Sequence, residues 1–329
     1  MFSFEPARKK QDPLFFIDDR PVYTHYKKDP SKRIGPFVDS KKFLGSEAFR
    51  ERYDLSRGES KIMQAAITSD IVPEGKLKTK FYNIRKDLNN RLFSEIDLRG
   101  SDKTIEWRYP TKIDAWPGTK IVIGSSGVGK SFLVVHEIIE ALKRKKKRSF
   151  IYVSPELNVD STLSKLKGTQ RWSKYFTGID ISDESVKQSE LSAEEFWRTL
   201  VEAKLLDASP GTTIILDDAP DSPIHRYLQA FLIKYLRTGR HRKVGIISIQ
   251  HKIKAGRWTS QSFSSVKFIQ LFPRGGGRGK LVEFLNDVVG LTRKQARQTI
   301  ETFGDAGRSM TLHAWAPNVL FGPKYATFV

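Results

Sequence analysis

The segment from Ile121 to Ser131, IVIGSSGVGKS, limits what this chain can fold into more than any other part of it. An apolar run enters a glycine-rich turn of the pattern G-x-x-x-x-G-K-[ST], and the helix-like run FLVVHEIIEAL follows. Between a strand and a helix, small residues let backbone N–H groups surround a phosphate, and the start of the helix favours the same negative charge. The segment therefore predicts a nucleoside triphosphate site.

Two segments supply the predicted nucleotide ligands. The expected phosphate-binding residues are Gly124, Ser125, Ser126, Gly127, Val128, Gly129, Lys130 and Ser131. We expect Lys130 to reach the β- and γ-phosphates of ATP and the Ser131 hydroxyl to bind Mg²⁺. The apolar run TTIILDD ends in Asp217, expected at the Mg²⁺ hydration shell, and Asp218, expected to polarise the attacking water. Acids at a strand end also cap helices, which is the alternative for both.

A third segment, LRTGRHRKVGIISIQHK, carries an amide and three arginines. Gln250 ends an apolar strand, at the edge where open parallel sheets place their sites. We expect it to hold the attacking water and sense the γ-phosphate; satisfying loop backbone is the alternative. Arg237, Arg240 and Arg242 precede the strand, too far to reach their own phosphates easily. In a ring, one of them would reach the next subunit as an arginine finger, and DNA or solvent contact stays open for each.

The pattern from Lys120 onward predicts the fold class. Short β-branched runs alternate with helix-like segments, as in parallel sheets with helical crossovers. The expected strands are 120–126, 149–155, 212–218, 244–250 and 266–272, and the expected helices are 131–146, 192–206, 223–237 and 281–303. Thr292 and Gln295 form a candidate capping box inside the last helix. We predict an α/β P-loop NTPase core at 111–329, with a mostly parallel sheet flanked by helices and a C-terminal helical or hairpin tail.

Residues 1–110 are expected to form an arm and accessory region of α/β or irregular structure. Proline and charge are dense up to about residue 40, which predicts either an extended arm that packs through Phe15, Phe16 and Tyr23, or a disordered tail. The segment 41–70 favours helix.

Aromatic residues in two places leave alternatives open. In 76–93, basic residues interleave with Phe81 and Tyr82, which fits either a nucleic-acid surface or a solvated amphipathic face. Trp107, Tyr109 and Trp116 precede the first core strand. One of them would cover the adenine; packing in a lid or in the core is the favoured alternative.

The charge indicates the class of partner. Lys and Arg number 57 against 37 Asp and Glu, which gives +20. A protein that holds a polyanion needs such an excess, because neutralised phosphates release counterions. An acidic protein partner and solubility are the alternatives. The run 143–148 is expected to complement a helix C-terminus, with DNA contact as the alternative, and the loop 272–280 to grip DNA or to be a mobile connection.

Features that the sequence lacks further limit the class of protein. Without cysteine the chain has neither a disulfide nor a thiolate metal site. Since no signal-like N-terminus or long apolar run is seen, we expect an intracellular protein without a membrane span.

A polar residue on a strand between the two nucleotide motifs is typical of the catalytic-glutamate (RecA/ASCE-like) ATPases. GSSGVGKS, IYVSPE, IILDD and GRHRKVGIISIQHK together resemble the FtsK–HerA superfamily. Within it, the chain is similar to the genome-packaging ATPases of poxvirus-type large DNA viruses, most clearly in Arg240 and His241 before a strand that ends in Gln250. The resemblance covers about 117–275, not the first hundred residues, and the tail HAWAPNVLFGP only weakly.

The resemblance implies a homo-oligomeric ring, hexameric or pentameric, that hydrolyses ATP to thread double-stranded DNA into a preformed capsid. It assigns Lys130 and Ser131 to the phosphates and Mg²⁺, Asp217 to the metal, Asp218 to the water, Gln250 to sensing and Arg240 to the finger. Asp218 replaces the glutamate of cellular translocases and suits the viral branch.

It further implies a capsid vertex protein as partner, and the host cytoplasm, viral factory or virion as location. A cellular HerA-like translocase or helicase in repair and a nucleotide-switched DNA-binding scaffold are the alternatives. The sequence shows no further acidic metal-binding cluster, so we do not expect a nuclease. The excess of basic residues disfavours a nucleotide kinase.

Overall fold

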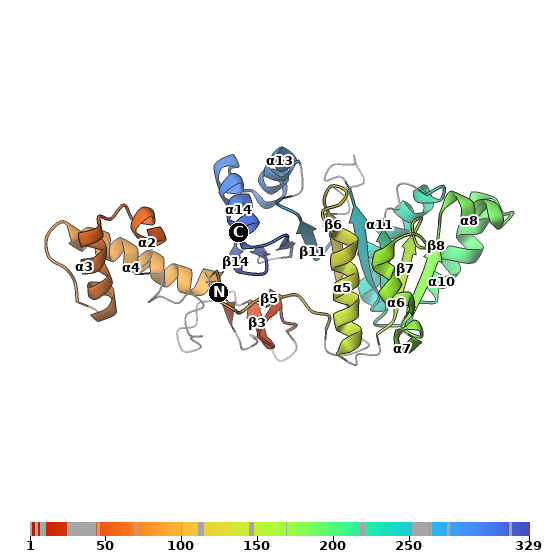
Figure 1. Cartoon of the computed structure of the whole chain (residues 1–329), viewed down its shortest axis with the longest axis horizontal. Helices are drawn as coiled ribbons and strands as arrows, with labels where there is room; N and C mark the ends of the chain where they lie inside the picture. Colours follow the sequence, from red (N-terminus) through yellow and green to blue (C-terminus); the bar gives the residue numbers. More distant parts are fainter. Residues whose placement is uncertain are drawn as a thin grey trace. The chain divides into compact units, whose positions relative to one another are not determined.

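The computed structural model describes residues 2–3, 6, 11–24, 44, 47–69, 71–99, 101–110, 115–144, 148–168, 170–217, 222–251, 263, 265–274, 277–315 and 318–329. The chain divides into two compact units (Figure 1). Unit 1 comprises Met1–Glu106 and Phe321–Phe328, and unit 2 comprises Trp107–Leu320 with Val329. Where the sequence suggested 1–110 and 111–329, the structure thus groups part of the C-terminal tail with the N-terminal unit.

A row of parallel strands forms the centre of unit 2. In spatial order they are β11 (Phe268–Leu271), β6 (Thr119–Ile123), β10 (Gly245–Gln250), β9 (Thr213–Asp217), β7 (Phe150–Ser154) and β8 (Phe176–Asp180). Beyond β11, β12 (Met310–His313) pairs with it antiparallel, and β13 (Val319–Phe321) is next in order. With helices between these strands, the predicted α/β class with a mostly parallel sheet is confirmed.

Both faces of this sheet are covered, which explains the continuous apolar runs in the sequence. Helix α5 (Lys130–Lys143) lies across one face (Figure 1). Its Val134 and Ile138 belong to one buried cluster with Val122 of β6. The neighbouring Ile121 is equally buried, so the opposite face is covered as well. Helix α11 (His225–Arg242) packs against β10. Shorter elements complete unit 2: a 3₁₀ turn (Ser161–Leu163), α6 (Ser164–Gly168), α7 (Gln170–Ser173) and α8 (Asp183–Gln188).

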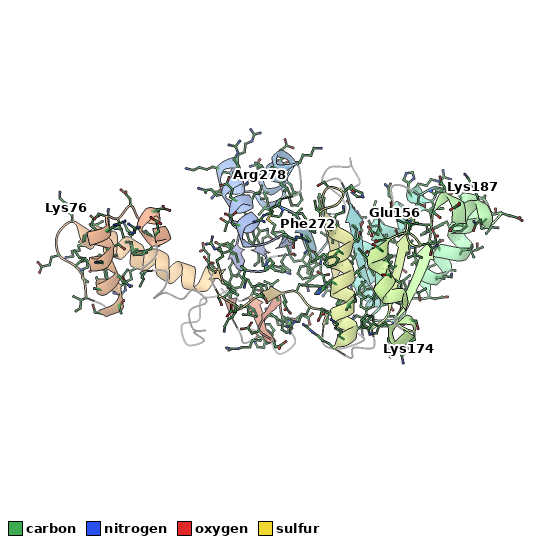
Figure 2. All side chains as sticks on the ribbon, in the orientation of Figure 1. Lys76, Glu156, Lys174, Lys187, Phe272 and Arg278 are labelled. Atoms are coloured by element: carbon green, nitrogen blue, oxygen red, sulfur yellow. The ribbon has the colours of Figure 1, made fainter. Side chains whose placement is uncertain are left out.

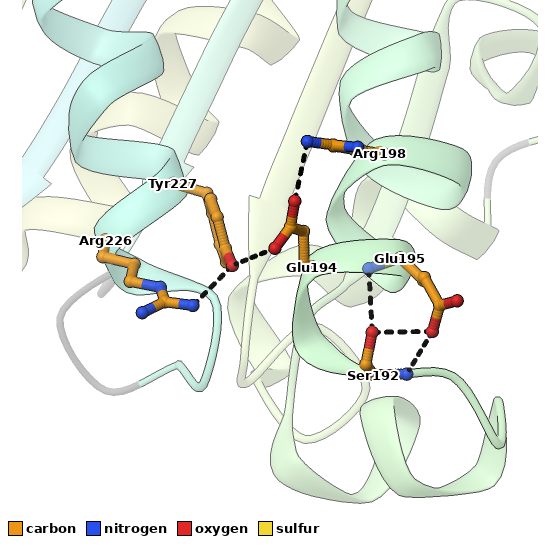
Figure 3. Close-up of polar contacts among 6 residues, drawn as sticks. All are labelled: Ser192, Glu194, Glu195, Arg198, Arg226 and Tyr227. Carbon is orange, nitrogen blue, oxygen red and sulfur yellow. Dashed lines mark hydrogen bonds and ion pairs between the residues drawn. The ribbon is translucent and has the colours of Figure 1, made fainter.

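The predicted helix 192–206 is present but changes its winding along its length. It consists of α9 (Ala193–Phe196), a π-helical segment (Trp197–Glu202) and α10 (Ala203–Leu206). Ser192 and Glu195 form a capping box at its start. Glu194 pairs with Arg198 at 2.7 Å and accepts a 3.5 Å hydrogen bond from the Tyr227 hydroxyl on α11 (Figure 3). The start of this segment is therefore joined to the start of α11.

The single helix expected over 281–303 is wrong. The structure has two helices there, α13 (Arg278–Val289) and α14 (Arg293–Ala306). Gly290 ends α13 with φ 79°, a left-handed conformation that glycine adopts without strain. The Thr292–Gln295 capping box is real, but it starts α14 instead of lying inside one helix. A strand was also missed, since β8 carries the exposed polar Thr177 and the glycine Gly178, which weakens its apolar pattern.

Unit 1 contains a small antiparallel sheet in the order β1 (Phe2–Ser3), β3 (Arg20–Thr24), β2 (Phe15–Ile17) and β5 (Ile105–Glu106). The described part of the N-terminal arm is therefore ordered and packs, with Phe15 fully buried. Pro21 fits in β3 because the β1 pairing involves only Tyr23 and Thr24, so no ladder bond to β1 needs a proline N–H. A second pairing joins β4 (Glu95–Asp97) to β14 (Tyr325–Phe328).

The helices of unit 1 confirm the helical tendency of 41–70. They are α2 (Glu47–Arg52), α3 (Arg57–Ser69) and α4 (Leu77–Ser94). Phe49, Met63 and Phe81 form a buried cluster between them. Phe81 is therefore a core residue and does not stack on bases, whereas Tyr82 is half exposed. In the described part of the chain, no helix has the length and apolar character needed to cross a membrane.

Candidate nucleotide-binding site

The phosphate loop lies where β6 passes into α5, as its sequence predicted. Gly129 caps α5 with φ 94°, a backbone conformation that would strain any residue with a side chain. Gly124 is required for a different reason: a Cβ there would lie 2.8 Å from Val128 Cγ2 and 3.2 Å from Phe272 Cδ2. The loop therefore needs glycine at position 129 for its backbone conformation and at position 124 for packing, apart from any phosphate contact.

Lys130 lies folded into this loop, with only 5% of its surface exposed. Its Nζ donates to the Ser125 carbonyl oxygen at 3.0 Å and lies 3.2 Å from His251 Nδ1. An ammonium group can only donate, so this contact makes Nδ1 the acceptor and places the proton of a neutral ring on Nε2. The sequence did not single out His251, which directly follows β10. The cation is thus held at the loop where a phosphate chain would pass.

The sheet order brings the three predicted motifs to one edge. β10 lies between β6 and β9, with Gln250 opposite Ile123 and Ile249 opposite Asp217. The Gly124 amide donates to the Gln250 carbonyl oxygen at 3.2 Å. Gln250 and then Asp217 therefore lie on one side of the phosphate loop, at the carboxyl edge of a parallel sheet, the usual place for a ligand in this architecture.

The Gln250 amide is held on one side only. Its Nε2 donates to Ser248 Oγ at 3.0 Å, which fixes the orientation of the group. Its Oε1 is buried and has no hydrogen-bond partner among the described residues. Leaving such an acceptor unsatisfied costs about 1–3 kcal/mol. An acceptor kept in this state beside the phosphate loop fits the expected role of holding a water molecule.

Tyr152 is a member of this site that the sequence did not indicate. It lies on β7, and its hydroxyl donates to Asp217 Oδ2. Burial raises the pKa of the Tyr152 hydroxyl far above its usual value, and the negative charge of Asp217 raises it further. The Ser131 side chain acts in the opposite direction and lowers that pKa. The Tyr152 hydroxyl therefore connects β7 with the end of β9.

The residues at this point fit a magnesium ion. Mg²⁺ prefers oxygen ligands and is usually bound through one or two protein groups while keeping several waters. The Ser131 hydroxyl, in the first turn of α5, and the buried Asp217 carboxylate, at the end of β9, supply such oxygens at the carboxyl edge of the sheet. No larger cluster of three or more acidic, histidine or cysteine ligands occurs in the described residues.

The structure does not describe the residue that we expect to activate water. Asp218 lies outside the described residues. Glu156 follows β7, the neighbour of β9, and its exposed side chain is labelled in Figure 2. It is a second carboxylate at the carboxyl edge of the sheet, in the segment IYVSPE.

Arg237, Arg240 and Arg242 lie near the amino end of β10, at the edge of the sheet opposite the phosphate loop. They occupy the last turns of α11, just before the amino end of β10, and all are exposed. Arg242 donates to the Tyr235 hydroxyl and the Leu206 carbonyl oxygen of its own chain. The Arg240 guanidinium lies 5.9 Å from the centre of the Trp315 ring. The structure therefore does not bring Arg240 or Arg242 to the phosphate loop of their own chain.

The aromatic residues before β6 belong to the core. Tyr109 is buried and meets Phe150 edge to face, with ring centroids 5.5 Å apart. Trp116 stacks on Trp315 and donates to the Val244 carbonyl oxygen, at the amino end of β10. The suggestion that one of them covers the adenine has no support here, because these contacts lie in the core or at the opposite edge of the sheet.

The basic segments have different surroundings. Arg148 is buried and donates to backbone carbonyl oxygens, so the last residue of the 143–148 run faces the core; Lys145, Lys146 and Lys147 lie outside the described residues. The segment 272–280, expected to be a loop, is helical from Arg278, where α13 begins. Its Arg274, Arg278 and Lys280 are exposed. Arg278 also lines a groove of about 450 Å³ on α13 and α14, and lies 3.9 Å from Glu301.

Comparisons with known proteins give structural neighbours only: no protein-family model matches the chain, and no curated protein is significantly similar in sequence. The genome packaging NTPase B204 from Sulfolobus turreted icosahedral virus 2, in complex with ATP-gammaS, is 14% identical, with 63% of this chain and 98% of that chain covered and a TM-score of 0.38.

Two further neighbours are as distant in sequence. The KaiC-like protein PH0186 from Pyrococcus horikoshii OT3 is 14% identical over 47% of this chain and 70% of that one, with a TM-score of 0.33. The cytoplasmic domain of the type VII secretion ATPase EccC from Thermomonospora curvata is 14% identical over 70% and 28%, with a TM-score of 0.41.

Proposed function

We propose that this chain is a Mg²⁺-dependent ATPase. The observation that carries the proposal is the position of β10 between β6 and β9, which gathers the phosphate loop, Asp217 and Gln250 at one carboxyl edge. Each has the chemistry that phosphoryl transfer to water requires: a cation and amides for the phosphates, a carboxylate for the metal and an amide for the water.

The proposed roles follow from these positions. Lys130 exchanges its present contacts with Ser125 and His251 for the β- and γ-phosphates. Ser131 and Asp217 hold Mg²⁺, which when bound neutralises charge that develops on the phosphate oxygens. Gln250 orients the attacking water through its free amide oxygen. Asp218 takes the proton from that water.

We further propose that hydrolysis drives translocation of double-stranded DNA by a ring of identical subunits that packages a viral genome. The net charge of +20 supports a polyanionic substrate. The arginines at the edge opposite the phosphate loop support action across a subunit boundary, because they cannot serve their own site. A hexamer or pentamer and a capsid vertex partner belong to this proposal, as does membership in the poxvirus-type branch of the FtsK–HerA superfamily.

The ATPase proposal is tested with Lys130→Ala. We expect hydrolysis to be lost, because the only buried cation at the described phosphate loop is removed. Lys143→Ala at the exposed end of the same helix is the matched control and should retain full turnover. Phosphate release from ATP is the measurement. Full turnover by Lys130→Ala would place the active site elsewhere.

The DNA proposal is tested with the intact chain. ATPase activity should rise with double-stranded DNA of any sequence, and the stimulation should fall steeply as salt increases, because binding releases counterions. DNA-independent hydrolysis would favour a nucleotide-switched scaffold. Stimulation together with strand separation would favour a cellular HerA-like helicase.

A further inference from the structure

Tyr152 makes a contact that core packing alone does not require. Its ring lies in the core of unit 2, 6.2 Å from the ring of Phe176, and is fully buried. A phenylalanine would fill this space equally well. The hydroxyl extends beyond the ring to Asp217 Oδ2, at the end of the neighbouring strand. Its presence therefore has to be explained by what it contacts.

The hydroxyl contacts one of the two expected magnesium ligands. The single proton of a tyrosine hydroxyl can be donated once, and here it goes to Asp217. Tyr152 lies on β7 and Asp217 ends β9, so this hydroxyl ties together two strands that are far apart in the sequence.

We propose that Tyr152 is a positioning residue for the magnesium site: its hydroxyl orients the Asp217 carboxylate toward the ion. The inference rests on the proposed ATPase function and adds to it a residue from a third strand. Groups that hydrogen-bond to metal ligands fix the ligand orientation, and their loss typically costs about 10–100-fold in metal affinity or activity. With Oδ2 held by Tyr152, the orientation of the whole carboxylate is set before the ion arrives.

The same hydroxyl stabilises Asp217 when no ion is bound. A buried carboxylate needs hydrogen-bond donors, and Asp217 is only 3% exposed. The Tyr152 hydroxyl supplies such a donor to Asp217 Oδ2. Tyr152 thus serves the site both before and after metal binding.

The test is Tyr152→Phe in the full chain, with the affinity for mant-ATP measured in EDTA and over a Mg²⁺ titration. We expect unchanged affinity in EDTA, because no phosphate contact is lost, and a rise of at least about tenfold in the Mg²⁺ concentration for half-saturation. Tyr109→Phe, a buried tyrosine that packs on Phe150, is the matched control and should leave the Mg²⁺ titration unchanged.

A double-mutant comparison separates positioning from general destabilisation. In an Asp217→Asn background the expected metal ligand is already lost, so adding Tyr152→Phe should have little further effect on the Mg²⁺ titration. If Tyr152→Phe has the same Mg²⁺ titration as the wild-type chain while Asp217→Asn changes the titration, the positioning role is wrong and the ATPase proposal stands. If the wild-type chain binds mant-ATP without any Mg²⁺ dependence, both proposals fail.

Discussion

Arg148 illustrates how a residue of a basic run can belong to the interior. Its Nη1 donates to the Gly211 carbonyl oxygen at 2.6 Å and to the Ala115 carbonyl oxygen at 3.3 Å, and Nη2 donates to the Pro110 carbonyl oxygen at 3.3 Å. The guanidinium also lies 5.6 Å from the centre of the Tyr109 ring. Arginine has donors enough to join several chain segments at once, which a lysine cannot do with the same geometry.

We predict that Arg148→Met destabilises unit 2 by about 3 kcal/mol, because several buried carbonyl oxygens lose their donor. Urea denaturation measures the change. Lys143→Met, five residues earlier in the same basic run and exposed, loses only a surface pair with Glu140 and should cost at most about 0.5 kcal/mol. Equal effects of the two substitutions would contradict a structural role for Arg148.

The water-activating acid is the second question at the scale of residues. We predict that Asp218→Asn lowers kcat for ATP by about 100-fold or more, with nucleotide binding retained, since only proton transfer is removed. Glu156→Gln, which changes a carboxylate just after the neighbouring strand β7 in the same way, should have a much smaller effect. Single-turnover hydrolysis measures both. The reverse order of effects would assign the base to Glu156.

At the scale of elements, the sequence predicts what depends on local pattern. The strands that became β6, β7, β9, β10 and β11 were expected because each is a continuous apolar run, and the phosphate loop because its spacing is specific. Tyr152 could not be found in this way. Its relation to Asp217 depends on β7 lying beside β9, which is a property of strand order and is not encoded in either segment alone.

The broken helix at Gly290 has a related cause. The apolar spacing of 281–303 continues across the turn, because α13 buries Leu281 and Leu285 and α14 buries Ala296 and Ile300. Periodicity therefore suggests one helix. A glycine followed by a capping box predicts that one helix ends and another begins. These local signals were more informative than the spacing of the apolar residues.

The prediction at the scale of elements concerns DNA binding by the basic residues at the start of α13. If the 272–280 segment grips DNA, Arg278→Gln together with Lys280→Gln should weaken binding to DNA of every sequence. Each lost phosphate contact should also lower the slope of log affinity against log salt by about 1. The matched control is Lys174→Gln with Lys187→Gln, two exposed lysines that Figure 2 places away from α13. Because both double variants lose the same charge, equal losses would indicate only a general charge effect.

For the whole molecule, the informative feature of unit 2 is that its sheet has two chemically different edges. The carboxyl edge holds Lys130, Asp217 and Gln250, while the amino end of β10 is preceded by the exposed arginines of α11. A single copy cannot bring the two edges together, because they are opposite ends of the same strand. Copies arranged head to tail can, and such contacts close into rings when the rotation allows it.

This arrangement makes a prediction that distinguishes the two arginines. If the proposed ring forms, Arg240→Ala should abolish its ATP turnover with ATP binding retained. In mixtures with the wild-type chain it should lower activity by more than its own share, because each defective subunit also disables the site of its neighbour. Arg242 is already bound to Tyr235 and Leu206 of its own chain, so Arg242→Ala should reduce stability and give a loss in proportion to its fraction. ATPase rates over a series of mixing ratios are the measurement. A strictly proportional loss for Arg240→Ala would mean that this arginine does not act on a neighbouring site.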